Sequence, residues 1–203
     1  MYRAETTTFT PMRTCLAPLL SALALSASAQ QWELTTPIKT YSEFFAIQMV
    51  NENVAYAVDK PMGTILRTTD GGNNWERRQV NSFNDPMAIH MWDEQRGITV
   101  GESGSVMRTT DGFATVTSTT NAGFGILRCV FFLNDTLGWA GSETGKIIRS
   151  TDGGATWTLM QSGQPSYNYI TNIQFLDPLV GYASCYAGEM LKRRVDPLAA
   201  QVD

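Results

Sequence analysis

The segment GKIIRSTDGGATW at residues 145–157 decides the fold, because the chain contains two earlier copies of it. These copies are GTILRTTDGGNNW at residues 63–75 and GSVMRTTDGFATV at residues 104–116. Their aspartates follow one another at intervals of 41 residues, at Asp70, Asp111 and Asp152. An internal repeat of this length predicts one supersecondary unit per copy, stacked on its neighbours.

Each unit reads as four short strands separated by turn-forming residues, with no room for an amphipathic helix. In the first unit the strands are Ala46 to Val50, Val54 to Asp59, Gly63 to Thr69 and Asn74 to Val80. A period near 40 residues with four strands per unit is typical of a propeller blade. The sequence therefore predicts an all-β fold, a β-propeller of four-stranded antiparallel blades.

The repeats predict three full blades and a partial fourth. A short landmark precedes each motif, as at Gly97-Ile98-Thr99, and recurs at Gly181-Tyr182-Ala183. The fourth copy stops matching after Lys192, with Arg194 and Val195 where Thr and Asp are expected. Trp32-Glu33-Leu34 aligns with the last strand of a blade, so a closed four-bladed ring is one interpretation. The abrupt end of the pattern favours a piece of a larger propeller.

The amino terminus has the features of an export signal. An apolar run of ten residues, 16–25, is too short to span a membrane. It is followed by Ala27-Ser28-Ala29, a small-residue cleavage site. We expect a signal peptide over residues 1–29, with synthesis starting at Met12 and cleavage between Ala29 and Gln30. Propeller repeats over residues 30–195 and an irregular tail over 196–203 complete the predicted organisation. The mature protein is then secreted or periplasmic, or lies on the extracellular surface, without membrane insertion.

Composition argues against several partners. The chain has 15 basic and 19 acidic side chains, a formal net charge of −4, so it lacks the basic field that nucleic acid requires. Export permits a disulfide between Cys129 and Cys185. The two cysteines occupy non-equivalent positions in the repeat, so the sequence does not show that they lie close together. Pairing and separate burial as small apolar residues both remain open.

The repeated motif S/T-x-D-x-G-x-x-W has a mechanical interpretation. The aspartate accepts backbone N–H groups across a hairpin, the glycine adopts a positive φ, and the aromatic side chain packs into the blade. We expect this structural role for Asp70, Gly72, Trp75, Asp111, Asp152, Gly154 and Trp157. The second copy has Phe113 at the glycine position and Val116 at the tryptophan position, which predicts a differently shaped or strained turn.

These motifs resemble the YCF48-like or BNR/Asp-box family, which includes photosystem II stability and assembly factors, sialidases and sortilin-type receptors. The resemblance covers residues 32–192 and is most specific at Ser150 to Trp157. It implies a propeller. It implies no single activity, because function lies in loops and face residues rather than in the fold.

An enzyme is the weaker interpretation. The F/Y-R-I-P tetrapeptide of sialidases is absent, and no catalytic residue, metal site or cofactor is predicted. Glu102, Glu143 and Glu189 recur at the turn before the third strand, and such recurrence favours a surface turn over a catalytic pair. The single histidine, His90, reads as a half-buried strand residue. An Asp-box glycoside hydrolase and a structural cell-surface repeat remain as alternatives.

A module for protein binding or assembly is the favoured function, with the partner unknown. The connections 81–87, 119–125 and 162–169 carry Phe83, Phe124, Tyr167 and Tyr169, which either form a recognition surface or pack between blades. A second candidate is the arginine that precedes each S/T-x-D-x-G-x-x-W motif, or Asp-box. These arginines are Arg67, Arg108 and Arg149. The resemblance to assembly factors makes an anion-binding row conceivable; we favour local pairing with an acidic neighbour or a backbone carbonyl.

Overall fold

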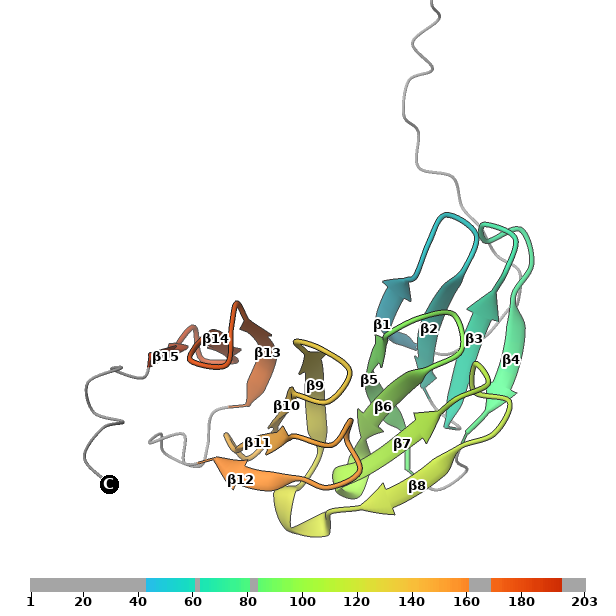
Figure 1. Cartoon of the computed structure of the whole chain (residues 1–203). Coiled ribbons are helices and arrows are strands. Elements are labelled where there is room, and N and C mark those ends of the chain that lie inside the picture. Colours follow the sequence, from blue (N-terminus) through green and yellow to red (C-terminus); the bar gives the residue numbers. More distant parts are fainter. Residues whose placement is uncertain (1–42, 61–62, 81–83, 161–168, 195–203) are drawn as a thin grey trace, which may run out of the picture. The chain divides into compact units, whose positions relative to one another are not determined.

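The structure is a computed structural model that describes residues 43–60, 63–80, 84–160 and 169–194. These residues form four antiparallel sheets in chain order, three with four strands and one with three (Figure 1). The predicted all-β architecture of three full units and a partial fourth is confirmed. The predicted signal peptide, the strand at Trp32-Glu33-Leu34 and the tail at 196–203 lie outside the described residues.

Every sheet is a meander in which each strand pairs with the next along the chain. The first sheet contains β1 (Glu43–Met49), β2 (Ala55–Lys60), β3 (Thr64–Thr68) and β4 (Glu76–Gln79). The second contains β5 (Pro86–Met91), β6 (Gly97–Gly101), β7 (Ser105–Thr109) and β8 (Thr117–Thr120). The third contains β9 (Leu127–Phe132), β10 (Gly138–Ser142), β11 (Ile147–Ser150) and β12 (Thr158–Met160). The fourth contains β13 (Ile170–Phe175), β14 (Val180–Cys185) and β15 (Met190–Arg194).

The first strand of every sheet carries a β-bulge at the same place. Pairing with the second strand shifts register by one residue, which leaves Phe45, Met87, Arg128 and Thr171 opposite no partner. A bulge bends the strand and re-aims a side chain toward the end of the sheet. These four positions differ in chemistry although the backbone repeats.

In the second, third and fourth sheets a glycine stands at or next to the start of the second strand, where a large side chain lies across it. A Cβ at Gly138 would overlap the ring of Phe132, one at Gly181 the ring of Phe175, and one at Gly97 the sulfur of Met91. The glycine landmark in the sequence is therefore the space that an aromatic or methionine side chain of the preceding strand occupies.

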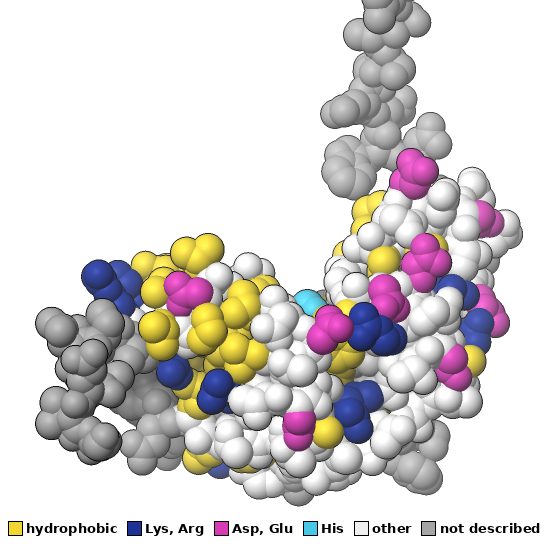
Figure 2. Space-filling view, viewed as in Figure 1, with side chains coloured by type: hydrophobic (Ala, Val, Ile, Leu, Met, Phe, Trp, Pro, Cys, Tyr) yellow, Lys and Arg dark blue, Asp and Glu magenta, His cyan; other side chains and the backbone are white. Residues whose placement is uncertain are grey.

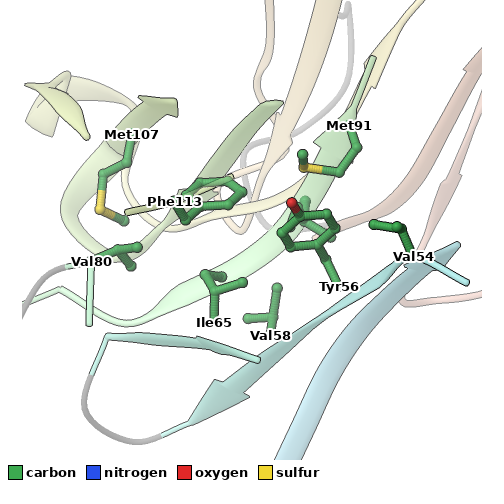
Figure 3. Close-up of a cluster of buried hydrophobic side chains, with 9 residues drawn as sticks. Val54, Tyr56, Val58, Ile65, Val80, Met91, Met107 and Phe113 are labelled. Carbon is green, nitrogen blue, oxygen red and sulfur yellow. The ribbon is translucent and has the colours of Figure 1, made fainter. Parts of the chain in front are cut away.

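Hydrophobic clusters join each sheet to the next. The first contains Tyr56, Val58 and Ile65 of the first sheet with Met91 and Phe113 of the second (Figure 3). In the third cluster, Trp139 stacks on Phe175 with ring centroids 3.6 Å apart. The core thus consists of repeated interfaces between sheets, as expected for units that cannot bury their faces alone.

The second Asp-box hairpin keeps the backbone of the others despite its divergent sequence. Phe113 has a φ of +66°, close to the +80° of Gly154, so of the two alternatives the structure has the strained turn, with its shape unchanged. The Phe113 ring is buried against Tyr56, with centroids 5.9 Å apart in edge contact. This contact offsets the strain of a left-handed non-glycine residue.

Cys129, Cys185 and His90 pack among hydrophobic side chains between the sheets. Cys129 and Cys185 are free thiols in the cluster between the third and fourth sheets, and burial raises the pKa of Cys129 to about 12. His90 packs against Trp92, Phe131 and Phe132, and burial lowers its pKa to about 4. No helix in the described part of the chain is long and apolar enough to cross a membrane.

Candidate functional site

The Asp-box hairpins share one hydrogen-bond pattern. In each, the hydroxyl of Thr68, Thr109 or Ser150 donates to Oδ1 of the aspartate two residues later, at 2.9, 2.9 and 2.8 Å. The same Oδ1 accepts the backbone N–H four residues further on, at 2.9 Å in all three hairpins. A side chain at that position donates to Oδ2, at 2.7, 2.7 and 2.6 Å. Both oxygens of each carboxylate are therefore engaged within their own hairpin.

These bonds stabilise the ionised aspartates. The backbone N–H of Asn74 is the largest influence that lowers the pKa of Asp70, and that of Thr115 lowers the pKa of Asp111 to about 2. At Asp152 burial acts to raise the pKa, but hydrogen bonds from Thr156 and Ser150 outweigh it, and the pKa falls to about 2. Such groups remain charged at neutral pH and are poor proton donors.

The aromatic positions of the hairpins differ in burial. Trp157 is buried in the cluster between the second and third sheets, and its Nε1 donates to the carbonyl of Gly154 at 3.2 Å. Trp75 is only half-buried, so the expectation that it packs into the core is wrong. Trp157 packs against the sheet that precedes its own in the chain. Among the described residues no sheet precedes the first one, so Trp75 has no such sheet to pack against.

The arginines before the Asp-boxes occupy equivalent register positions but have different surroundings. Arg67 donates from Nε to the hydroxyl of Tyr56 at 2.8 Å, so its partner is neither the acidic side chain nor the carbonyl that we expected. The residue equivalent to Tyr56 is Ile98 in the second sheet, opposite Arg108, and Trp139 in the third, opposite Arg149. Within the ranges that the structure describes, neither Arg108 nor Arg149 forms an ion pair.

Arg108 lines a polar cavity of about 300 Å³ together with Trp92, Asp135 and Asp152. Asp135 accepts from Arg96 at 3.0 Å, and Asp152 is engaged in its own hairpin. Positive and negative groups are mixed here, so the cavity offers no continuous anion-binding row.

The opposite end of the sheets carries two clusters of one kind, each with a cation between an aromatic ring and a glutamate. In the first, Lys60 lies 5.3 Å from the ring centre of Phe45 and 3.6 Å from Glu102. In the second, Arg128 lies 4.9 Å from the ring centre of Tyr169 and 3.7 Å from Glu143. Phe45 and Arg128 are both bulge residues, which shows how the bulge brings side chains to this end.

The second cluster continues into an exposed pair of tyrosines. Tyr169 and Tyr186 have ring centres 5.6 Å apart, and their backbones are joined by a hydrogen bond of 2.9 Å. Tyr169 is 39% exposed and Tyr186 76% exposed. We call Arg128, Tyr169 and Tyr186 the tyrosine–arginine patch. Figure 2 shows hydrophobic side chains gathered over the sheet of β13–β15. Tyr169 directly precedes β13, and Tyr186 lies in the turn between β14 and β15.

The other aromatic candidates do not join this patch. Phe124 lies in the short 3-10 helix η2 (Ala122–Phe124) and packs against the cluster between the second and third sheets. Its ring is therefore partly buried between sheets, which is the packing alternative given for it above. Phe83 and Tyr167 lie outside the described residues.

No protein-family model and no curated protein matches the chain, but several solved structures do. YCF48 from Cyanidioschyzon merolae is 18% identical, with a TM-score of 0.62 over 74% of this chain and 50% of that chain. YCF48 bound to D1 peptide is 21% identical, with a TM-score of 0.58 over 73% and 49%. The WD40 beta propeller domain of Doa1 is 9% identical, with a TM-score of 0.63 over 80% and 54%.

The fold is that of a β-propeller. The four sheets are its blades, and the chain spans about half the length of the two YCF48 structures. An ancestral GH74 enzyme also matches, at 17% identity and a TM-score of 0.57, over 70% of this chain and 22% of the enzyme. Identities this low show the fold alone, and propellers serve many functions.

Sequence reasoning missed two members of the tyrosine–arginine patch. Arg128 could not be found from the sequence, because its position at the end of the blade depends on the bulge, which no residue type indicates. Tyr186 was visible in principle, since it is an aromatic residue in the turn between β14 and β15.

Proposed function

We propose that the chain is an exported, non-catalytic propeller module that binds a protein partner through the tyrosine–arginine patch. The observation that carries this proposal is the exposed tyrosine pair beside an arginine that is held by Glu143. Tyrosine and arginine are enriched among the residues that dominate protein–protein binding, because they offer large contact area and several hydrogen bonds at little conformational cost.

Charge pairing within the patch supports a pre-organised surface. Arg128 lies between the Tyr169 ring and the Glu143 carboxylate, so these contacts restrict the side chain before a partner arrives. The propeller neighbour that is bound to D1 peptide shows that the fold accommodates a peptide ligand. For the present chain we propose only that the ligand is a protein.

The same contacts favour binding over catalysis. A glycosidase needs one carboxylate as acid and another as base or nucleophile, in environments that differ. Glu102 and Glu143 lie in corresponding turns, and each has a cation of its own, Lys60 and Arg128 respectively. Two carboxylates in matched surroundings do not divide these roles.

Affinity capture with patch variants tests the proposal. The tagged chain is expressed in its own host, and proteins that it retains are quantified against Arg128→Ala, Tyr169→Ala and Tyr186→Ala. A specific partner should fall at least tenfold with each substitution and be unaffected by Leu159→Ala, an exposed apolar residue on β12. A partner retained equally by all four variants would place binding elsewhere.

Export has its own test. Mass spectrometry of the extracytoplasmic fraction should find an amino terminus at Gln30. An intact terminus at Met1 or Met12 on a cytoplasmic protein would remove the exported part of the proposal and leave the binding part standing.

A further inference from the structure

The outward face of the first sheet has the side chains of an interface between sheets. Met49 lies opposite Ala55, as Met91, Phe132 and Phe175 lie opposite Gly97, Gly138 and Gly181 near the start of their second strands. Those three equivalents are 5%, 5% and 8% exposed, whereas Met49 is 66% exposed. Ile47, two residues earlier, is 68% exposed, while its equivalents Ile89 and Ile173 are 8% and 2% exposed. We call Ile47, Met49 and the half-buried Trp75 the leading face.

The fourth sheet exposes the other half of the same interface. Tyr182 lies opposite Lys192, as Tyr56, Ile98 and Trp139 lie opposite the arginines that precede the Asp-boxes. Those three equivalents are completely buried, whereas Tyr182 is 45% exposed. Met190 is 70% exposed, and its equivalents Ile65 and Val106 are completely buried. We call Tyr182, Met190 and the 81% exposed Leu176 the trailing face.

A polar contact accompanies the apolar one at two of the three junctions, those between the first and second and between the second and third sheets. Glu94 of the second sheet accepts from Asn51 of the first at 2.7 Å, and Asp135 of the third accepts from Arg96 of the second at 3.0 Å. The equivalent residue in the turn before β2 is Glu52, which is exposed. The leading face therefore has both the apolar side chains and the hydrogen-bond acceptor through which a sheet contacts the sheet before it.

We propose that the leading face of one copy of this chain binds the trailing face of a second copy, head to tail. The interface repeats the apolar junction that the chain forms three times internally, so the register of these apolar side chains is already given. Because the two faces differ, the contact is heterologous: two copies close on each other if the rotation allows it, and longer assemblies form if it does not.

Sedimentation velocity of the purified chain, in the form that the cell produces, tests the proposal. We expect a concentration-dependent dimer or larger assembly. Ile47→Asp damages only the leading face and Met190→Asp only the trailing face. Both side chains are exposed in the single chain, so both variants should fold. Each should weaken self-association at least about tenfold, whereas Leu159→Asp, at an exposed apolar residue on neither face, should not.

Mixing the two variants distinguishes head-to-tail binding from general stickiness. Ile47→Asp retains an intact trailing face and Met190→Asp an intact leading face, so an equimolar mixture should form a 1:1 complex although neither variant associates alone. A mixture that remains monomeric, a wild-type chain that is monomeric at its highest soluble concentration, or variants that associate like wild type would each overturn the proposal.

Discussion

His90 shows how one buried residue links stability to pH. Burial lowers its pKa from 6.5 to about 4, so between these values the unfolded chain binds more protons than the folded chain. Stability is therefore complete above pH 6.5 and declines as the pH falls toward 4, by on the order of 3 kcal/mol. His90→Phe, which keeps a ring among Trp92, Phe131 and Phe132, should flatten this decline.

Urea denaturation at several pH values between 6.5 and 4 measures this difference. The comparison of the wild type with His90→Phe cancels the titration of other groups. Equal slopes of stability against pH in the two proteins would show that His90 is solvated in the folded state.

Asp152 tests the Asp-box bonds. Asp152→Ala removes the acceptor for the Thr156 N–H and the Ser150 hydroxyl, and we expect a loss of about 1 kcal/mol. Asp152→Asn retains an acceptor oxygen and should lose less. Midpoints of urea unfolding compare the two, and an equal loss would mean that the negative charge, rather than the hydrogen bonds, stabilises the hairpin.

Single residues were also where sequence reasoning was least complete. The repeat showed that Phe113 stands at a glycine position but could not show that the hairpin keeps its shape, because the compensating contact comes from Tyr56 in another blade. Arg67 likewise pairs with Tyr56, across the strand. Partners that depend on tertiary packing are not visible in the spacing of a motif.

At the level of strands, Gly138 tests why glycine begins the second strand. Gly138→Ala places a Cβ against the Phe132 ring, and we expect a loss of about 1–3 kcal/mol from overpacking. Gly123→Ala is the matched control, because nothing lies within 4 Å of its added Cβ, and it should change stability by less than about 0.5 kcal/mol.

A double variant locates the cause of that loss. Phe132→Leu makes room for the added methyl group, so the combined Gly138→Ala and Phe132→Leu changes should cost less than the sum of the two single changes. Strict additivity in thermal melts would contradict the proposed overlap.

The strands themselves could be predicted well from the repeat. The first predicted strand, Ala46 to Val50, overlaps β1 (Glu43–Met49), and the predicted Val54 to Asp59 overlaps β2 (Ala55–Lys60). The bulges could not be predicted, because a register shift depends on pairing with the neighbouring strand rather than on composition. They matter for function, since they determine where Arg128 and Phe45 lie.

For the whole molecule, the fold followed from period and turn chemistry, while the candidate site did not. Tyr169 was predicted, but its association with Arg128 and Tyr186 requires three segments from two blades to meet. A repeated scaffold is encoded in every copy. A binding surface is encoded once, in the positions where the copies differ.

An activity assay of the whole protein tests the proposed absence of catalysis. We expect no turnover above background on a panel of α- and β-glycosides, because Glu102 and Glu143 have matched cationic neighbours. Release of a chromogenic aglycone that disappears in Glu143→Gln would reverse this expectation and favour a glycoside hydrolase.

Site-specific cross-linking most directly tests whether the tyrosine–arginine patch binds a protein. A photoreactive phenylalanine analogue replaces Tyr186 in one protein and the exposed Leu159 in a control, and both are irradiated in the living host. We predict one defined protein adduct from position 186, absent from position 159 and lost when Arg128→Ala is added. No adduct from position 186, or the same adducts from both positions, would contradict the proposed binding site.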